Sequence, residues 1–180
     1  MIIIGYQGIG KSSLTEKVLK RITNGNLDGP SAVYVDLESS NRYAEDGNCP
    51  EDWYKFYCKT ALHLSNIGFT VFTSCHPVVR EYFKEITHGD HPCIHVCYPS
   101  HDLKEAWIDK LRERYNISKL EKDLRAYSYA RDNYDENIRV LEESGFNKIV
   151  ITDIDYDLES VIRSAKLKFK REMKLFSPGE

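Results

Sequence analysis

Residues 5–12 read Gly-Tyr-Gln-Gly-Ile-Gly-Lys-Ser and fit the pattern G-x-x-x-x-G-K-[ST] at every required position. Glycines let backbone N–H groups turn around phosphate oxygens, and a following helix adds partial positive charge at its N-terminus. In this motif Lys11 would reach the β- and γ-phosphates and Ser12 would ligate Mg²⁺. The motif therefore predicts a nucleoside triphosphate site. Its expected binding residues are Gly5, Gln7, Gly8, Ile9, Gly10, Lys11, Ser12 and Ser13.

The sequence on both sides of the motif supports this interpretation, because a phosphate loop needs a strand before it and a helix after it. Residues 1–4 are apolar throughout, as in a buried parallel strand. After Ser12, Leu14, Val18 and Ile22 recur every four residues, which is typical of an amphipathic helix. The motif thus has the structural context that it requires.

An acidic pair follows the next β-rich run, residues 31–35. Asp36 and Glu38 are two positions apart, so an extended backbone points both carboxylates the same way. Such a pair can hold Mg²⁺ through water and accept the proton of an attacking hydroxyl; the alternative is an acidic loop that caps the next helix. We predict that Asp36 is catalytic and holds the metal. Glu38 and Arg42 are candidate substrate-binding residues, although Arg42 also fits a solvated surface arginine.

Arg80 stands one turn into the helix expected after the third strand. A helix N-terminus with an arginine in its first turns favours an anion, so Arg80 is a third candidate for substrate binding. His76 lies nearby, but a lone histidine is more often a structural hydrogen-bonding residue than a catalyst.

Two further arginines fall on apolar helix faces. At 100° per residue, one apolar stripe contains Leu103, Trp107, Leu111 and Tyr115. Arg114 falls inside this stripe. The next helical stretch has a second stripe, in which Arg131 fills the slot between the two tyrosines. Its members, which follow spacings of three and four residues, are Leu120, Leu124, Tyr127, Tyr134, Ile138 and Leu141. A charge on a buried face needs a partner. A triphosphate would serve; the alternatives are a core carboxylate or a side chain that reaches solvent. We predict that Arg114, as a catalytic residue, and Arg131, as a substrate-binding residue, belong to a closing lid.

Strands and helices alternate along the chain. Strands are expected at residues 1–4, 31–35, 69–74, 93–97 and 148–152, and helices from residue 12 and at 51–67, 78–86, 103–115, 118–143 and 158–174. This alternation predicts an α/β fold with a mostly parallel sheet covered on both faces. Ligands bind such sheets at the carboxyl ends of the strands, where the candidate residues lie.

Composition limits the remaining possibilities. A chain of 180 residues suits a single domain, and 41% hydrophobic with 29% charged residues describes an ordinary soluble protein. A formal net charge of −3 gives no reason to expect a nucleic-acid surface. No apolar run approaches a membrane span, and the early strand leaves no room for a signal peptide. We expect a cytoplasmic protein without membrane or nucleic-acid partners, whose five cysteines are reduced thiols.

In these features the chain resembles the P-loop kinases of small metabolites, namely the nucleoside monophosphate kinases and their shikimate- and gluconate-kinase-like relatives. The phosphate loop lies on the first strand, the pair Asp36 and Glu38 ends the second, and Arg80 follows the third. Residues 110–114, Lys-Leu-Arg-Glu-Arg, are similar to an R-L-x-x-R lid signature after the fourth strand. The first basic position of that signature is lysine here, so Arg114 is the position that matches.

The resemblance implies a three-layer α/β/α fold with a five-stranded parallel sheet in the order 2-3-1-4-5. It implies ATP as the donor and Mg²⁺ as the metal, held by Ser12 and Asp36. The loop at residues 153–156 would lie near adenine, which makes Asp155 a candidate nucleotide-binding residue. It also implies a substrate-side helical region at about residues 37–67 and a lid at about residues 112–131, both within one domain.

We therefore predict an ATP-dependent phosphotransferase that moves the γ-phosphoryl group of Mg-ATP to a small acceptor. A (deoxy)nucleoside monophosphate is the leading acceptor. The alternatives are a non-catalytic or regulatory ATP-binding protein and a polynucleotide 5′-hydroxyl kinase. A GTPase is disfavoured because residues 147–150, Asn-Lys-Ile-Val, lack the aspartate of the guanine-reading N-K-x-D motif. The oligomeric state stays open.

Overall fold

The computed structural model describes residues 1–25, 33–39, 49–88 and 93–176. Its five strands form one parallel sheet in the order β2-β3-β1-β4-β5. They are β1 (Ile2–Gly5), β2 (Tyr34–Asp36), β3 (Thr70–Ser74), β4 (Ile94–Pro99) and β5 (Asn147–Ile151). Both the all-parallel sheet and the strand order confirm the expected fold.

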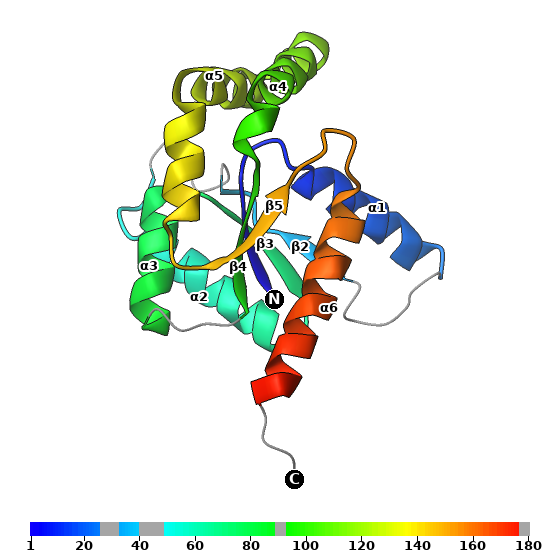
Figure 1. The fold of residues 1–180 in the computed structure, drawn as a ribbon, viewed down its shortest axis with the longest axis vertical. Helices are drawn as coiled ribbons and strands as arrows, with labels where there is room; N and C mark the ends of the chain where they lie inside the picture. Colours follow the sequence, from blue (N-terminus) through cyan, green and yellow to red (C-terminus); the bar gives the residue numbers. More distant parts are fainter. Residues whose placement is uncertain (26–32, 40–48, 89–92, 177–180) are drawn as a thin grey trace.

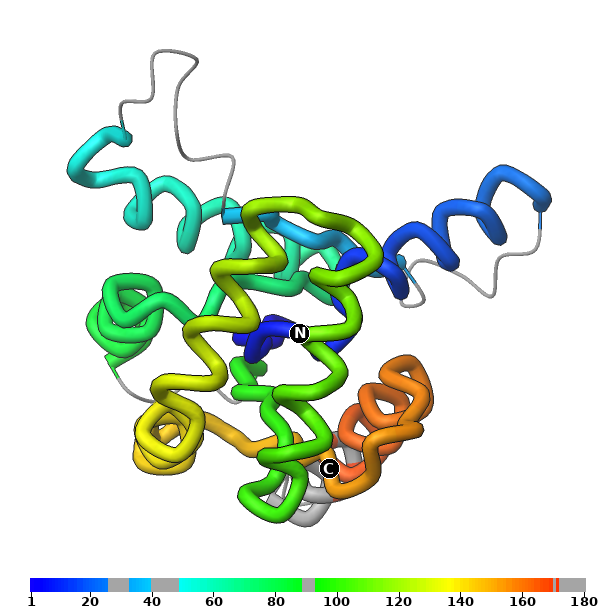
Figure 2. Tube along the Cα trace, turned by 90° about the horizontal axis from the view of Figure 1, so that it is seen from above, coloured from blue at the N-terminus to red at the C-terminus, as the bar shows by residue number. Residues whose placement is uncertain are grey.

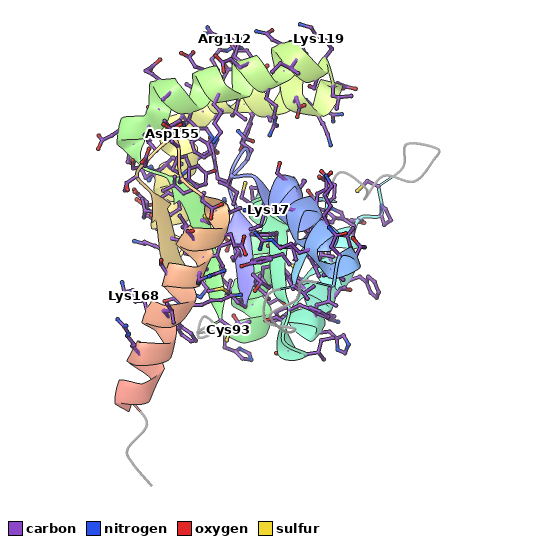
Figure 3. The ribbon with its side chains drawn as sticks, turned by 90° about the vertical axis from the view of Figure 1, so that its right-hand side faces the viewer. Lys17, Cys93, Arg112, Lys119, Asp155 and Lys168 are labelled. Atoms are coloured by element: carbon purple, nitrogen blue, oxygen red, sulfur yellow. The ribbon has the colours of Figure 1, made fainter. Side chains whose placement is uncertain are left out.

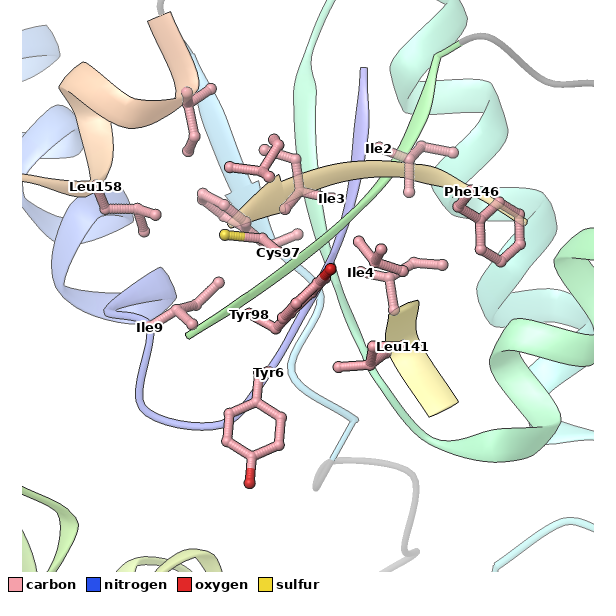
Figure 4. Packing of buried hydrophobic residues seen from close by; sticks show 14 of the residues in the cluster. Ile2, Ile3, Ile4, Tyr6, Ile9, Cys97, Tyr98, Leu141, Phe146 and Leu158 are labelled. Atoms are coloured by element: carbon pink, nitrogen blue, oxygen red, sulfur yellow. The ribbon is translucent and has the colours of Figure 1, made fainter. Parts of the chain in front are cut away.

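β1 lies at the centre of the sheet, between β3 and β4. In the register, Ile3 stands opposite Phe72 on one side and His95 on the other. Ile2, Ile3 and Ile4 are fully buried because both faces of this strand are covered by helices. Figure 4 shows these side chains along β1 and Tyr6 beyond the strand's carboxyl end. The phosphate loop therefore starts at the end of the central strand, which is hydrogen-bonded on both sides and buried on both faces.

Helices cover the two faces of the sheet (Figure 1). α1 (Lys11–Thr23) and α6 (Leu158–Phe176) lie on one face. α2 (Trp53–Asn66), α3 (Pro77–Thr87) and the second part of α5 (Glu121–Glu142) lie on the other. This arrangement confirms the three-layer α/β/α architecture.

A pair of helices extends above the carboxyl edge of the sheet. A short 3-10 turn (His101–Leu103) leads into α4 (Lys104–Ser118), which is followed by α5. We call α4 and the part of α5 before Asn133 the covering helices. Seen from above, they pass over β1 (Figure 2). The predicted lid at residues 112–131 falls within this pair.

The long helical region expected at about residues 118–143 begins at Glu121 and is interrupted once. Lys119 has a left-handed φ of 54° and ends α4. Asn133, with φ −136° and ψ 21°, breaks the regular geometry inside α5. The second part of α5 can therefore pack on the sheet while the first part stays above its edge. No helix in the described parts of the chain combines the length and apolar character needed to cross a membrane.

Candidate active site

The phosphate loop between β1 and α1 is supported from outside by α4. Gly8 and Gly10 have φ values of 84° and 87°, which L side chains rarely adopt. A Cβ atom at Gly8 would lie 2.8 Å from Leu111 Cδ2. The indole nitrogen of Trp107 donates a hydrogen bond of 3.1 Å to the carbonyl oxygen of Gln7. The turn that the glycines permit is therefore held by the first covering helix.

Two polar side chains of the motif stand in the first turn of α1. The helix begins at Lys11 after the N-cap Gly10, so no side chain caps its first N–H groups, which suits an anion. Lys11 Nζ donates to the carbonyl oxygen of Gly5 at 3.0 Å. Ser12 Oγ donates to Asp36 Oδ2 at 2.7 Å. The structure thus brings together the two residues that sequence analysis assigned to the metal.

Tyr57, from α2, fixes the strand ends beside this contact. Its hydroxyl donates to the carbonyl oxygen of Leu37 at 2.7 Å and accepts from the backbone N–H of Ser74 at 2.8 Å. One side chain therefore joins the carboxyl ends of β2 and β3. Asp36, the last residue of β2, is held in place by this connection.

The electrostatic environment of Asp36 combines opposing influences. Burial raises the pKa of its carboxyl group, and the negative charge of Glu38 adds to that effect. The hydrogen bond from Ser12 and the positive charges of Lys11 and Lys122 lower the same pKa. The carboxylate is thus partly withdrawn from water and depends on nearby cations and on the hydroxyl of Ser12.

The donor set fits Mg²⁺. Within the described residues, no group of three His, Cys, Asp or Glu side chains could hold a metal ion by itself. Mg²⁺ usually takes only one or two protein carboxylates and completes its shell with water and substrate phosphates. The hydroxyl of Ser12 and the carboxylate of Asp36, beside a phosphate loop, are such a partial set.

A cavity of about 670 Å³, which we call the large cavity, opens between the strand ends and the covering helices. The ends of β1, β2 and β3 form its floor, and α5 forms its roof. Its lining residues are Gly5, Gln7, Lys11, Asp36, Leu37, Glu38, Ser39, Ser74, Cys75, His76, Lys122, Arg125, Ala126, Ser128, Tyr129, Asp132 and Asn133.

A second cavity of about 210 Å³, the loop cavity, lies against the phosphate loop. It is lined by Gln7, Gly8, Ile9, Gly10, Lys11, Ser12, Ser13, Glu38, Arg114, Lys122 and Asp123. Gln7, Lys11, Glu38 and Lys122 line both cavities. The two spaces therefore meet beside Lys11, where a group passed from one ligand to another would lie.

Arg114 has both a cavity and a protein partner. It lines the loop cavity, as its predicted role requires. Its Nη2 also lies 2.8 Å from Oδ1 of Asp123, which is only 6% exposed. Asp123 accepts a further hydrogen bond of 2.6 Å from Ser118 Oγ. The core carboxylate that sequence analysis left open as a partner is therefore present, and it ties α4 to α5.

The structure does not bring Arg80 or Arg131 into the candidate site. Arg80 is buried, and its Nη1 donates to the carbonyl oxygen of Cys75 at 3.0 Å, behind the large cavity. Arg131 is exposed, and its Nε lies 2.7 Å from Oδ1 of Asp132. Neither arginine lines the large cavity or the loop cavity. Arg42 lies outside the described residues.

The inward orientation predicted for Arg131 is wrong because the buried stripe follows different residues in the first part of α5. In this part, Asp123 and Ala130 are buried, whereas Leu120 and Leu124, which the predicted stripe contained, are 50% and 38% exposed. Tyr134, Ile138 and Leu141 of the same stripe are buried. The break at Asn133 separates the two parts of α5, so the predicted stripe names the correct face of the second part and the wrong face of the first.

Asp155 lies in the loop between β5 and α6, next to α4 (Figure 3), and lines neither cavity. Its neighbour Tyr156 stacks on Trp107 with ring centroids 5.9 Å apart. Lys110 Nζ lies 4.7 Å from the centroid of each ring. Burial lowers the pKa of Lys110, and the negative charge of Asp155 acts in the opposite direction. The proximity of this loop to adenine stays a prediction.

Sequence reasoning missed the polar side chains that α5 contributes to the large cavity. Lys122, Arg125 and Tyr129 recur at spacings of three and four residues and share one helix face. This polar periodicity is visible in the sequence, but the helix faces were assigned from the apolar residues alone. The spacing of the polar residues in this helix was the signal that could have identified them.

Neither the known family models nor the curated proteins include a match to this chain. Among solved structures, the chain is similar to a gluconokinase from Sinorhizobium meliloti 1021, with a TM-score of 0.50 and 12% sequence identity. The likeness covers 94% of this chain and 90% of the other. At this identity the likeness concerns the fold, and it confirms the P-loop, gluconate-kinase-like architecture that the resemblance implied.

Proposed function

We propose that this chain, built on a P-loop kinase fold, is an ATP-dependent phosphotransferase that moves the γ-phosphoryl group of Mg-ATP to a small acceptor. The hydrogen bond of 2.7 Å between Ser12 and Asp36 carries this proposal. It joins the motif hydroxyl, which lines the loop cavity, to a carboxylate at the floor of the large cavity. Nucleotide binding alone needs the loop, whereas transfer also needs a carboxylate and a space for an acceptor.

Each residue of the candidate site has a separate role in the proposed transfer. The loop N–H groups and Lys11, released from the Gly5 carbonyl, would bind the donor phosphates. Ser12 and Asp36 would hold Mg²⁺, which supplies neutralising charge to phosphoryl oxygens when bound. If the acceptor attacks through a hydroxyl, an oxygen of Asp36 would accept its proton; the ionised phosphate oxygen of a mononucleotide attacks without losing one.

The large cavity supports a nucleoside monophosphate as the acceptor. Its volume of about 670 Å³ is within the range of sites that bind ligands of that size. Lys122 and Arg125 provide cations for a phosphate group, and Tyr129 provides an aromatic ring that a base can contact. Glu38 and Asp132 provide acceptors for sugar hydroxyls or base amines.

A small polyhydroxy acid is the second candidate, and the likeness to a gluconokinase favours it. Its carboxylate would use the same two cations, Lys122 and Arg125. A six-carbon acid would fill much less of the large cavity than a mononucleotide.

The proposal is tested by measuring ADP formation over mononucleotides, nucleosides, small hydroxy acids and 5′-hydroxyl oligonucleotides. The matched control is Lys11→Ala, which should abolish transfer and greatly weaken ATP binding, because a point charge on phosphate is lost. Circular dichroism should be unchanged, since the side chain donates to the carbonyl oxygen of Gly5 at the end of β1 and is not part of the buried core.

Two results would redirect the assignment. ATP affinity equal to the wild type in Lys11→Ala, with Mg²⁺ present, would contradict the phosphate-loop site. ATP binding without acceptor-dependent ADP release would identify a binding or regulatory module.

A further inference from the structure

Three basic side chains of the covering helices divide between the two cavities. Arg114 lines only the loop cavity, and Arg125 lines only the large cavity. Lys122 lines both. Because the cavities meet beside Lys11, Lys122 stands opposite that lysine at the boundary between the two spaces.

Lys122 also differs from the two arginines in its partners. Arg114 is paired with Asp123, and Arg125 Nη2 lies 3.3 Å from Glu121 Oε1. Over the described ranges, Lys122 makes no ion pair or hydrogen bond of its own. Its charge nevertheless acts on the Asp36 carboxylate, on the opposite side of the boundary. A cation that neither hydrogen-bonds nor pairs with any described residue is available to a ligand at this place.

The neighbouring residue fixes the backbone that carries Lys122. The carboxylate of Asp123 is buried and accepts from Ser118 and Arg114. The backbone N–H of Asp123 donates to the carbonyl oxygen of Leu120 at 3.0 Å. The first turn of α5 is therefore anchored to the end of α4, which aims the adjacent Lys122 toward the cavities.

We propose that Lys122 is a catalytic residue whose ammonium group contacts the transferring phosphoryl group, between a donor served by Arg114 and an acceptor served by Arg125. This inference rests on the proposed function. During transfer the bond from γ-phosphorus to the β–γ bridging oxygen breaks, and its electron pair stays on ADP. A new bond forms from the acceptor oxygen to γ-phosphorus; a hydroxyl acceptor passes its proton to Asp36, and the ionised phosphate oxygen of a mononucleotide has none to pass. Lys122 keeps its protons and donates hydrogen bonds to a phosphoryl oxygen.

The test uses Mg-ADP with and without aluminium fluoride, which occupies the place of the transferring phosphoryl group and needs no known acceptor. The wild type should bind Mg-ADP more tightly when fluoroaluminate is present. Lys122→Ala should lose about tenfold or more of that preference, because one charged donor to the phosphoryl oxygens is removed. Its affinity for Mg-ADP alone should stay within about twofold, and Lys122→Arg should retain most of the preference.

Two control variants, each of which also removes one positive charge, test whether the effect depends on the position of Lys122. Arg125→Ala removes a cation from the large cavity only and should keep the wild-type preference. Lys119→Asn removes a lysine on the outer side of the covering helices (Figure 3), at a left-handed position that asparagine tolerates, and should also keep it. With an identified acceptor, Lys122→Ala should lower kcat by about a hundredfold, whereas Arg125→Ala should raise the acceptor KM.

The outcomes distinguish this assignment from the proposed function. If Lys122→Ala keeps the wild-type preference for fluoroaluminate, or if the wild type binds Mg-ADP without any such preference, the role of Lys122 is overturned. If the wild type binds no Mg-ADP and no Mg-ATP, the proposed function itself fails. Lys122 is exposed on its helix, so its variants should fold as the wild type does.

Discussion

At the scale of single residues, the hydroxyl of Ser12 and the carboxylate of Asp36 depend on each other. The hydroxyl comes from the first turn of α1 and the carboxylate from the last position of β2. A carboxylate withdrawn from water needs hydrogen-bond donors or cations, and Ser12, Lys11 and Lys122 supply them. The same arrangement keeps Asp36 ready for a metal ion or for a hydroxyl proton.

Asp36→Asn should lower turnover by roughly a hundredfold or more, with little change in ATP affinity. Asparagine keeps the size and can still accept a hydrogen bond from Ser12, but it lacks the charge that Mg²⁺ or an incoming hydroxyl needs. Steady-state kcat and KM for ATP test this. Near wild-type turnover would move the catalytic carboxylate to Glu38 or away from this loop, and Glu38→Gln is the comparison that separates the two.

Residue positions that follow from a local motif could be predicted from the sequence, whereas positions that depend on tertiary contacts could not. The positions of Lys11 and Ser12 follow from eight consecutive residues, and that of Asp36 from its place after a strand. Arg80 had an equally suitable place after a strand, yet its guanidinium turns back to the Cys75 carbonyl. Strand-end position does not determine the direction of a long side chain.

At the scale of elements, the covering helices are joined by a charge inside their contact. No apolar pattern predicts that Asp123 is buried, because burial of a carboxylate is favourable only with the partner that Arg114 provides. The polar face of α5 was missed for a related reason. Its phase is set by packing on α4 and by the break at Asn133, which the apolar periodicity of the sequence does not encode.

Arg114→Ala should lower the free energy of unfolding by about 1–3 kcal/mol, because buried Asp123 loses its charged partner. It should also weaken transfer, since Arg114 lines the loop cavity. Arg112→Ala is the control: its side chain points away from the sheet (Figure 3) and pairs with exposed Asp109. The control should change stability by less than about 0.5 kcal/mol. Urea unfolding and turnover of both variants test this.

The double variant Arg114→Ala/Asp123→Asn identifies the cause of any loss in stability. It should recover part of the stability, because the unpaired buried charge is removed. If Arg114→Ala unfolds like the wild type, the ion pair does not stabilise the covering helices. If it loses stability but keeps wild-type turnover, Arg114 is structural and its predicted catalytic role is wrong.

At the scale of the whole molecule, the alternation of strands and helices was sufficient to predict the layers, and the resemblance supplied the strand order. The shape of the large cavity was not predictable, because it is formed by three strand ends and a helix that are far apart in sequence. The acceptor is therefore the part of the function about which the sequence says least.

Stability of the whole fold should fall as the pH drops below neutrality, because of His95. This residue is 4% exposed between the sheet and α6, and burial lowers its pKa to about 4, with the Met1 amino group adding to the effect. Between pH 6.5 and 4 His95 binds a proton in the unfolded chain but not in the native state, so the free energy of unfolding decreases as the pH falls. The loss from pH 7.5 to 5 should be about 2 kcal/mol.

Urea unfolding of the wild type and of His95→Gln at these two pH values tests this expectation. Because the substitution in a buried position itself changes absolute stability, the quantity to compare is the difference in unfolding free energy between the two pH values. A wild type and a variant with the same pH dependence would show that His95 does not cause it.

The central place of β1 has a consequence for the newly made chain. Its hydrogen-bonding neighbours, β3 and β4, follow far later, at residues 70–74 and 94–99. At ordinary translation rates the ribosome needs roughly 5–20 s to add the intervening residues, a separation of about 90 positions. The run of three isoleucines in β1 lacks both partner strands until β3 has been made and one of them until β4 has been made, which invites association with other nascent chains. The phosphate loop gains its support from Trp107 only when α4, which follows β4, has emerged, so nucleotide cannot assist the early steps of folding.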